Sequence, residues 1–395
     1  MMQDLKRRNF LRLSGLSLLP LALPLSAASA LDKPKIAAAN SNAVSFDDDG
    51  PFYEPEAYLS KLQEINKTDP IKNDFYGKGG AVARLQDKFI QETGKEAAIY
   101  LPSGTMANQL AIATLSGENT KVFVQETSHI YRDEADAAQS VFHKRLIPLA
   151  PGAPHFTLEE LQEGMNYYNQ GEVFKSGTGA VAIENPVRRC DGRQLPFAEL
   201  QRISGFCRQN SYPMHLDGAR LYLAAAWSGI SIAAYAALFD TVYISLYKYL
   251  GANGGAILCG SKNIISQMEH LIKVHGGTVF SSWTNAAMAL HHLEGLTERL
   301  KLSADKAKVL FTSLNELQGL SIKAIDNGSN IFDLHLPQGI DPVKFRKVLE
   351  TADQIQVGKA NKENLVKLRV NETLLLQDNQ KIVRAFDSAL KAAQG

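Results

Sequence analysis

Short apolar runs alternate with amphipathic segments along most of the chain. The apolar runs are continuous, which is typical of strands buried in a sheet. Between them, apolar positions recur at helical spacing, as at Leu85 and Phe89, and Gly94 and Gly117 end two of the predicted helices. Strands that alternate with helices predict an α/β fold with a mainly parallel sheet covered by helices. The predicted strands cover residues 97–101, 122–125, 180–183, 214–216, 241–246 and 256–258.

The pattern changes near residue 280. A long helical stretch from Ser282 to Leu317 is predicted there, followed by shorter α and β segments. Before residue 76 the chain is polar and rich in turns, with one short helix near 55–65. We therefore expect an N-terminal arm at 31–75, a large domain at 76–280 and a smaller C-terminal α/β domain at 281–395.

Residues 1–30 have the pattern of an export signal. Four basic side chains precede an apolar run at 13–25, and Ala28-Ser29-Ala30 matches a signal-peptidase site. The apolar run is short and contains two prolines, which disfavours a membrane-spanning helix. Because Arg7-Arg8-Asn9-Phe10-Leu11 also resembles the twin-arginine motif, we predict export to the periplasm, with no membrane span once the signal is removed.

Charge and cysteine content exclude several classes of protein. The 395 residues carry a net charge of +1 with no long block of one sign, which argues against a dedicated nucleic-acid binder. The three cysteines, Cys190, Cys207 and Cys259, cannot all pair, and none has the CxxC spacing of a metal site. We expect buried thiols and no bound metal.

Polar residues follow several of the predicted strands. In Pro102–Asn108 a strand ends and a glycine-containing turn opens a helix, whose free amides and positive end suit a phosphate. Ser103 and Thr105 add hydroxyl donors, and Gly104 lets a ligand approach the backbone closely. The same string is compatible with an ordinary helix cap, because serine and threonine are common capping residues.

Asp217 and Lys248 extend this pattern. Asp217 follows the strand at 214–216, with Arg220 three residues later, and Lys248 follows the strand at 241–246. Taken alone, Asp217 and Arg220 can equally form a salt-bridged turn, and Lys248 can be a solvated surface group. At a buried strand end, an unpaired ammonium is costly, so the pKa of a lysine falls and its amine becomes nucleophilic. A phosphate cradle, a carboxylate for a pyridinium nitrogen and a nucleophilic lysine are what pyridoxal phosphate (PLP) requires.

The sequence resembles the threonine aldolase and β-eliminating lyase family of fold-type-I PLP enzymes. The resemblance covers roughly residues 70–390 and implies PLP as the cofactor. It also implies a large domain with a mainly parallel sheet of the seven-stranded type and a smaller C-terminal α/β domain. The strings that carry it are Tyr76-Gly77, Lys95–Ala98, Pro102–Ala111, Ser128–Tyr131, Glu184-Asn185, Leu216–Arg220, and Lys248 with Leu250-Gly251.

The resemblance implies roles for individual residues. Lys248 is expected to hold the cofactor aldehyde as an imine, and Asp217 to pair with the pyridine nitrogen. His129 is expected to stack on the ring face and to move protons. The other implied ligands are Ser103, Gly104 and Thr105 for the phosphate, Arg220 for the ring's phenolic oxygen or the substrate carboxylate, and Arg369 for that carboxylate.

Three departures from the family pattern concern the substrate rather than the cofactor. The family's Glu-Asn-Thr-His is Glu184–Val187 here, which lacks an imidazole near the substrate's β-hydroxyl. The family's Arg-Ser-Asp is Asp47–Asp49, so Asp48 replaces a serine that helps to hold the substrate carboxylate. The glycine-rich stretch at 276–281 lacks an arginine that reaches a neighbouring subunit's cofactor.

These observations predict a PLP-dependent lyase. We expect retro-aldol cleavage of a β-hydroxy-α-amino acid such as threonine to glycine and an aldehyde. One alternative is β-elimination of an amino acid to a keto acid and ammonia, and another is a non-catalytic exported binding protein on the same fold. Because fold-type-I enzymes build each active site at a subunit interface, the resemblance also implies a homodimer or homotetramer that takes a small amino acid as substrate.

Overall fold

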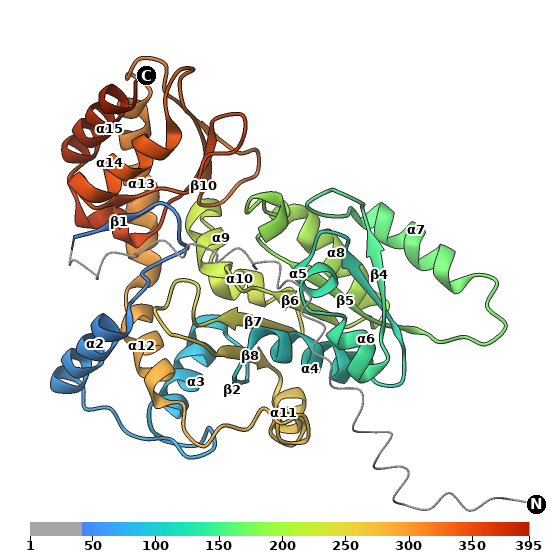
Figure 1. Ribbon diagram of the computed structural model, residues 1–395. Helices are drawn as coiled ribbons and strands as arrows, with labels where there is room; N and C mark the ends of the chain where they lie inside the picture. The colour runs from blue at the N-terminus through green and yellow to red at the C-terminus, as the bar shows by residue number, and fades with distance from the viewer. Residues whose placement is uncertain (1–41, 395) are drawn as a thin grey trace, which may run out of the picture. The chain divides into compact units, whose positions relative to one another are not determined.

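A seven-stranded sheet is the largest sheet in the computed structural model, which describes residues 42–394 (Figure 1). The predicted export signal at 1–30 and the first part of the predicted arm lie outside the described residues. The strands occur in the order β2-β8-β7-β6-β5-β3-β4. Their bounds are Ala97–Leu101 (β2), Lys121–Gln125 (β3), Arg145–Leu149 (β4), Thr178–Glu184 (β5), Met214–Asp217 (β6), Thr241–Ser245 (β7) and Ala256–Gly260 (β8).

Strand direction in this sheet brings several strand ends to one edge. Strands β4, β3, β5, β6 and β7 are parallel, and β8 is antiparallel to both of its neighbours, β7 and β2. Strand β2 therefore points in the same direction as β7. The carboxyl ends of six strands thus share one edge, which is where ligands bind in sheets of this type. The predicted mainly parallel α/β fold is confirmed.

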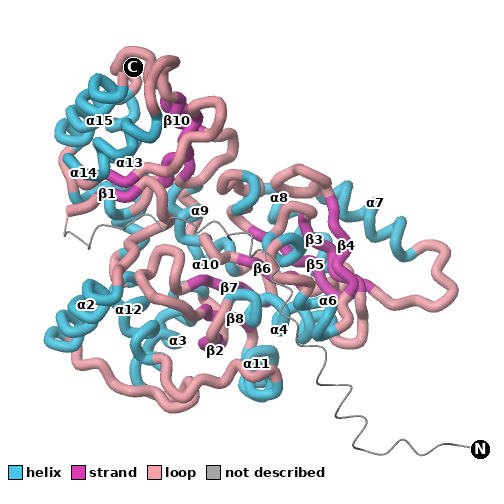
Figure 2. The backbone as a smooth tube through the Cα atoms, viewed as in Figure 1, coloured by secondary structure: helices cyan, strands magenta, loops and turns pink. Residues whose placement is uncertain are grey.

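Helices cover the sheet. In Figure 2 the strands, in magenta, lie among helices, in cyan. Helix α4 (Gly104–Ser116) packs across strands β5 to β8, and Leu110 and Ala111 are among its fully buried residues. The other helices up to residue 293 are α2 (Pro55–Thr68), α3 (Gly80–Thr93), α5 (His129–Arg132), α6 (Ala137–Phe142), α7 (Leu158–Asn169), α8 (Phe197–Gln209), α9 (Leu221–Ser228), α10 (Ile232–Ala236), α11 (Lys262–Val274) and α12 (Trp283–Leu293).

A second hydrophobic cluster joins the start of the described chain to its end. Val44 and Phe46 pack with buried residues between Ala307 and Ala393. Strand β1 (Val44–Ser45) pairs in parallel with β11 (Ile355–Gln356). The remaining elements are α13 (Leu296–Leu314), α14 (Pro342–Asp353), α15 (Asn379–Ala393), the short helix η2 (Glu372–Leu376), and a three-stranded antiparallel sheet of β9 (Ser321–Ala324), β10 (Ile331–His335) and β12 (Leu365–Arg369). The boundaries at residues 75 and 280 stay predictions.

Several elements were not predicted individually, and three of the differences from the sequence-based expectation have a clear physical reason. Strand β4 was not predicted, because Pro148 interrupts its pattern, and proline is tolerated at the edge of the sheet where β4 lies. Helix α7 was also missed, although Thr157 and Glu160 form a capping box at its start. The single helical stretch expected from residue 282 to 317 is two helices, because Gly295 adopts a positive φ of 64° between α12 and α13.

The three thiols are free. Cys207 and Cys259 are buried, as expected, whereas the expectation is wrong for Cys190, which ends the short helical turn η1 (Arg188–Cys190) and is only partly buried. Among residues 42–394, no helix combines the length and the apolar character needed to cross a membrane.

Candidate active site

One cavity of about 270 Å³ lies where several sheet strands end. Asp217 ends β6, Lys248 follows β7 by three residues, His129 follows β3 by four, and Gly104 opens α4 after β2. All four line this cavity, together with Thr105, Arg220, Glu184, Arg188, Asp133 and the tyrosines Tyr243 and Tyr247. The shared direction of these strands explains why side chains far apart in the sequence meet here.

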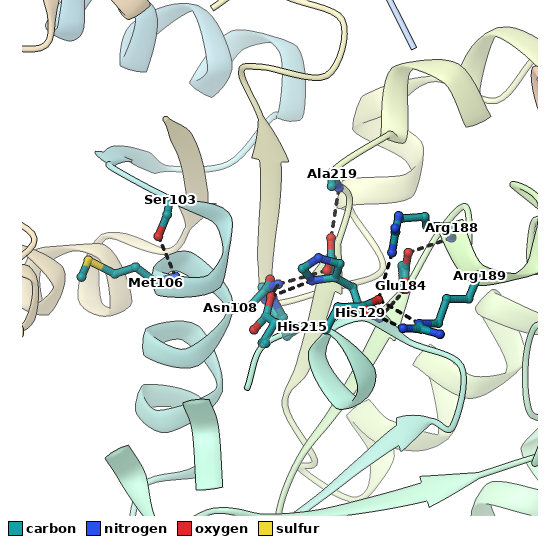
Figure 3. A network of polar contacts seen from close by, with 12 residues as sticks. Ser103, Met106, Asn108, His129, Glu184, Arg188, Arg189, His215 and Ala219 are labelled. Carbon is teal, nitrogen blue, oxygen red and sulfur yellow. Dashed lines mark hydrogen bonds and ion pairs between the residues drawn. The ribbon is translucent and has the colours of Figure 1, made fainter. Parts of the chain in front are cut away.

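The structure brings together most of the residues that the sequence singled out. Gly104, Thr105, His129, Asp217, Arg220 and Lys248 line the cavity. Ser103 and Arg369 do not. Ser103 instead caps α4, with its hydroxyl oxygen accepting from the amide of Met106 at 3.2 Å (Figure 3). Arg369, on β12, donates from Nη1 to the backbone oxygen of Asp47 at 3.1 Å.

The surroundings of Lys248 favour a nucleophilic amine. Burial, and next the positive charge of Arg220, lower the pKa of this amine to about 8. Its Nζ lies 4.6 Å from the centre of the Tyr247 ring. At neutral pH a larger fraction of this amine than of an ordinary lysine is therefore uncharged, which is the form that attacks a carbonyl carbon.

Asp217 is a buried carboxylate with a hydrogen-bond donor on each oxygen. The backbone amide of Ala219 donates to Oδ1 at 3.2 Å, and Asn108 Nδ2 donates to Oδ2 at 3.0 Å. Burial raises the pKa of Asp217, and His129 opposes this shift with its positive charge. The donors favour the ionised carboxylate, which can pair with a protonated ring nitrogen.

The start of α4 offers backbone amides to an anion. The first N–H groups of a helix have no acceptor within the helix, and the positive end of the helix dipole favours a negative charge. Gly104 is required here for packing, since a Cβ on this residue would lie 2.0 Å from the hydroxyl of Tyr243. Tyr243 fills the space that a side chain would take and keeps the helix start close to the cavity.

His129 is held by two carboxylates from different segments. Its Nδ1 lies 3.0 Å from Glu134 Oε1, and its backbone amide donates to Glu184 Oε2 at 2.6 Å. The hydrogen bond to Glu134 raises the pKa of His129. Glu184 also accepts from the amide of Arg188 at 2.8 Å, and burial, followed by the charge of Asp217, raises its pKa to about 7 (Figure 3).

Sequence reasoning assigned no role to Asn108, Glu134 or Glu184. Asn108 and Glu184 lie within strings that resemble the family, so their positions were visible but their contacts were not. Glu134 gave no signal beyond its spacing of five residues after His129. One ring nitrogen of His129 and one oxygen each of Glu134 and Asp217 lie within 4.8 Å of one another. Asn108 Nδ2 donates to both of these carboxylates, so hydrogen bonds account for their proximity.

The arm contributes acids to the rim of the site. Asp49 Oδ2 accepts from Arg220 Nε at 2.8 Å, so part of the Arg220 guanidinium is already engaged. Asp48 accepts from the hydroxyl of Ser45 at 2.9 Å, and burial raises its pKa. The family serine that Asp48 replaces is thus exchanged for a carboxyl group that favours its uncharged form more than a typical aspartate does.

The donor set of the cavity fits PLP. Lys248 supplies an amine for the aldehyde, Asp217 a carboxylate for the ring nitrogen, and α4 free amides for the phosphate.

Comparisons with known proteins point to one family. The family described as Beta-eliminating lyase matches residues 64–336. The chain is 31% identical to the low-specificity L-threonine aldolase of Candida albicans over 259 residues, which are 65% of this chain and 68% of that enzyme.

Solved structures show the same fold. One, a candidate aromatic amino acid beta-eliminating lyase/threonine aldolase from Exiguobacterium, has a TM-score of 0.72 at 24% identity, with 89% of this chain and 98% of that chain covered. A serine palmitoyltransferase solved with PLP has a TM-score of 0.62 at 14% identity, with 89% of this chain and 88% of that chain covered.

Proposed function

The chain belongs to the beta-eliminating lyase family, and from this premise we propose that it is a PLP-dependent lyase that cleaves a β-hydroxy-α-amino acid to glycine and an aldehyde. The observation that carries the proposal is the meeting of Lys248, Asp217 and the start of α4 in one cavity. The names of the relatives support a threonine-like substrate. The predicted family, fold and PLP cofactor are confirmed by these comparisons.

The residues of the cavity would have separate roles in holding PLP and in supporting its chemistry. When bound, PLP supplies a ring that accepts the electrons left on the substrate's α-carbon. Lys248 binds the cofactor aldehyde, and Asp217 holds a proton on the ring nitrogen so that the ring can take up negative charge. The amides of Gly104 and Thr105 bind the phosphate.

His129 would move the proton that cleavage requires. Its Nδ1 faces Glu134, which leaves Nε2 as the ring atom able to accept a proton from the substrate's β-hydroxyl. A carboxylate on one ring nitrogen fixes the tautomer and stabilises the protonated ring. Glu184, with a pKa of about 7, is a second group in the cavity that exchanges protons near neutral pH.

β-Elimination is the second candidate, and one observation favours it. Val187, at the position of the family's second imidazole, is fully buried in the core. This position therefore offers no base for a β-hydroxyl, and a reaction that expels the β-substituent without abstracting its proton does not require one. The two reactions share Lys248 and Asp217 and differ in their products.

Product analysis separates these reactions. Purified mature protein is incubated with L-allo-threonine, and the carbon products are identified. Glycine with acetaldehyde is the expected result, whereas 2-oxobutyrate with ammonia would indicate that the enzyme catalyses β-elimination. Neither product, from a protein that retains its cofactor, would mean that the substrate is not threonine-like.

A non-catalytic role makes a different prediction for Lys248. If the protein is an enzyme, Lys248→Ala abolishes product formation. Lys95→Ala is the control, at a lysine that lies outside the cavity and donates to the backbone oxygen of Phe239. Unchanged activity in Lys248→Ala would contradict the assignment of this lysine as the residue that binds the cofactor aldehyde. No product from either the wild type or any variant, with any β-hydroxy amino acid, would favour the binding protein.

We also propose that two copies of the chain associate. Phe75, Tyr76 and Phe280 are each more than half exposed, yet they pack on one another with ring centres 5.4 to 5.6 Å apart. Phe75 and Tyr76 line a surface cavity of about 600 Å³. An apolar patch of this kind on a soluble protein is typical of an interaction surface. A second copy is the occupant that the family resemblance supports.

Export is a separate proposal that rests on residues 1–30 alone. The twin-arginine route carries folded proteins, so the cofactor can bind in the cytoplasm before transport to the periplasm. Replacing Arg7 and Arg8 by lysine should retain the protein in the cytoplasmic fraction. If the periplasmic amount of this variant equalled that of the wild type, the general secretory route would be favoured. If the wild-type protein itself were absent from the periplasm, the export proposal would be wrong.

A further inference from the structure

Asn108 joins two carboxylates that lie beneath the candidate active site. Its Nδ2 donates to Asp217 Oδ2 at 3.0 Å and to Glu134 Oε1 at 2.7 Å. Asn108 is fully buried, and both carboxylates are also buried. An amide nitrogen carries two hydrogens, so each carboxylate receives one of them and neither needs to be protonated to avoid the other.

A buried histidine supports the direction of this amide. His215 Nε2 lies 2.9 Å from Asn108 Oδ1, and His215 Nδ1 lies 2.8 Å from Thr241 Oγ1. Figure 3 labels Asn108 and His215 in this network. Burial lowers the pKa of His215 to about 3, so its ring is neutral and carries one hydrogen. Because Oδ1 can only accept, Nε2 must donate, and Nδ1 must accept from the Thr241 hydroxyl.

The hydrogen bonds therefore run in one direction from Thr241 to the carboxylates. The Thr241 hydroxyl donates to His215, His215 donates to Asn108, and Asn108 donates to Asp217 and Glu134. If the amide of Asn108 turned over, its oxygen would face both carboxylates and its nitrogen would face the Nε2 hydrogen of His215. The first arrangement is repulsive because the carboxylates can only accept, so they fix the amide, and His215 in its Nε2–H tautomer supports that orientation through Oδ1.

We propose that Asn108, oriented by His215 and Thr241, is a positioning residue that keeps Asp217 ionised for the cofactor's ring nitrogen and at the same time lets Glu134 orient His129. None of Asn108, His215, Thr241 and Glu134 lines the cavity. Their effect on the cofactor is exerted through Asp217 and His129, which do. The inference rests on the PLP cofactor of the proposed function but not on which reaction the enzyme catalyses.

Other charged groups near Asp217 set the background for this effect. His129 and Glu134 lie beside it after β3, and Glu184, Arg220 and Lys248 line the cavity that Asp217 also lines. Tyr243 faces it from β7 with a hydroxyl whose pKa is raised by burial, so this tyrosine stays neutral. These groups remain in every variant below, so a change in pH dependence reports the loss of the Asn108 donor or of the contacts that orient it.

Replacing Asn108 removes the donor directly. In Asn108→Ala, protein stripped of cofactor should bind added PLP about ten- to a hundredfold more weakly, the range expected for a buried hydrogen bond to a charged group. The two carboxylates then face each other without a donor, so one of them binds a proton more readily. Because the ring nitrogen requires an ionised Asp217, the pH at which PLP affinity is lost on acidification should move upward.

Thr241 offers a matched pair of variants remote from the cavity. Thr241→Val removes the hydroxyl and keeps the shape, whereas Thr241→Ser keeps the hydroxyl. Thr241→Val should weaken PLP binding by about two- to tenfold, the range for one neutral hydrogen bond, and should move the pH dependence in the same direction as Asn108→Ala. Thr241→Ser should bind PLP with the wild-type pH dependence.

Two quantities are measured for each variant. The first is the dissociation constant of PLP from pH 5 to 9, an interval that spans about two units on each side of neutrality. The second is the thermal midpoint of the cofactor-free protein. A lower thermal midpoint with an unchanged pH profile in Asn108→Ala and Thr241→Val would show that the network is merely structural, and would overturn the inference. Equal profiles for Thr241→Val and Thr241→Ser would also overturn it. If the wild-type protein itself did not bind PLP, the proposed function would fail instead.

Discussion

The amine of Lys248 lies among charges of both signs. Arg220 and Arg188 lower its pKa, Asp49 and Asp217 raise it, and burial is the largest influence and lowers it. The outcome is a pKa of about 8, compared with about 10.4 for an unperturbed lysine. At the scale of single residues, the site is thus a set of ordinary side chains whose acidity is changed by burial and by neighbouring charges.

This shift predicts how fast the stripped protein takes up its cofactor. Only the uncharged amine attacks an aldehyde, so the rate of PLP uptake should rise with pH and level off above about 8. The measurement is the growth of visible absorbance after mixing with excess PLP across a series of pH values. Free N-acetyl-lysine amide is the control, and its rate should keep rising to about pH 10. The same continued rise in the protein would show that Lys248 is not perturbed.

Helix α4 links the sheet to the candidate phosphate site at the scale of elements. Its first residue, Gly104, packs against Tyr243 of β7, and its later residues Leu110 and Ala111 are buried against the sheet. The helix therefore cannot shift along the sheet without disturbing either the core or the cavity. The position of its free amides is fixed by packing along the whole helix.

Gly104→Ala tests this coupling. The added Cβ would lie 2.0 Å from the Tyr243 hydroxyl, so the tyrosine or the start of the helix must move. We expect a loss of about 1–3 kcal/mol in the free energy of unfolding, as for other overpacked sites, together with weaker PLP binding. Denaturant unfolding and PLP titration measure the two effects.

Gly205→Ala is the matched control. Gly205 lies inside α8, and apart from its own helix nothing lies within 4 Å of the position that a Cβ would take. Alanine there should stabilise the protein by roughly 0.5–1 kcal/mol and leave PLP affinity unchanged. If Gly104→Ala behaved like Gly205→Ala in both assays, the contact with Tyr243 would have no bearing on the site.

At the scale of the whole molecule, exposed aromatic side chains are placed on two different surfaces. Phe75, Tyr76 and Phe280 form a mutual cluster beside a cavity, and the backbone amide of Tyr76 donates to the backbone oxygen of Phe280 at 2.9 Å. Phe174 is 92% exposed in the loop after α7. The first arrangement is a cluster of rings in mutual contact, whereas Phe174 packs on no other aromatic ring among the described residues, so we assign self-association to the first.

Phe280→Asp should convert the associated protein to monomers. A charge placed in an apolar interface loses its hydration without gaining a partner, so association becomes unfavourable. Sedimentation velocity at several concentrations measures the change in mass. Phe174→Asp makes the same chemical change at an exposed phenylalanine and should leave the mass unaltered. If Phe280→Asp remained a dimer, the interface would lie elsewhere on the molecule. If the wild-type protein were a monomer, the proposal of self-association would be wrong.

Much of the fold and part of the site were predictable because they depend on short segments. Alternating strand and helix patterns predicted the α/β sheet, and the strand-turn-helix string at Pro102–Asn108 predicted a helix that opens within it, as α4 does. Asp217 and Lys248 were identifiable because each lies at or shortly after the end of a strand. The split at Gly295 and helix α7 were missed, although a glycine and a capping box were present in the sequence.

The remaining features were decided by tertiary structure. Asn108 and His215 are 107 positions apart, and no local pattern shows that they share a hydrogen bond. Arg369 was expected at the substrate, but the packing of β12 beside the arm places its guanidinium at Asp47. The sequence by itself determined the backbone elements and the chemical groups at their ends, since hydrogen bonds and caps within an element join near neighbours. Burial and through-space charge, which set the pKa of Lys248 and the partners of Asp217, exist only once distant segments have packed together.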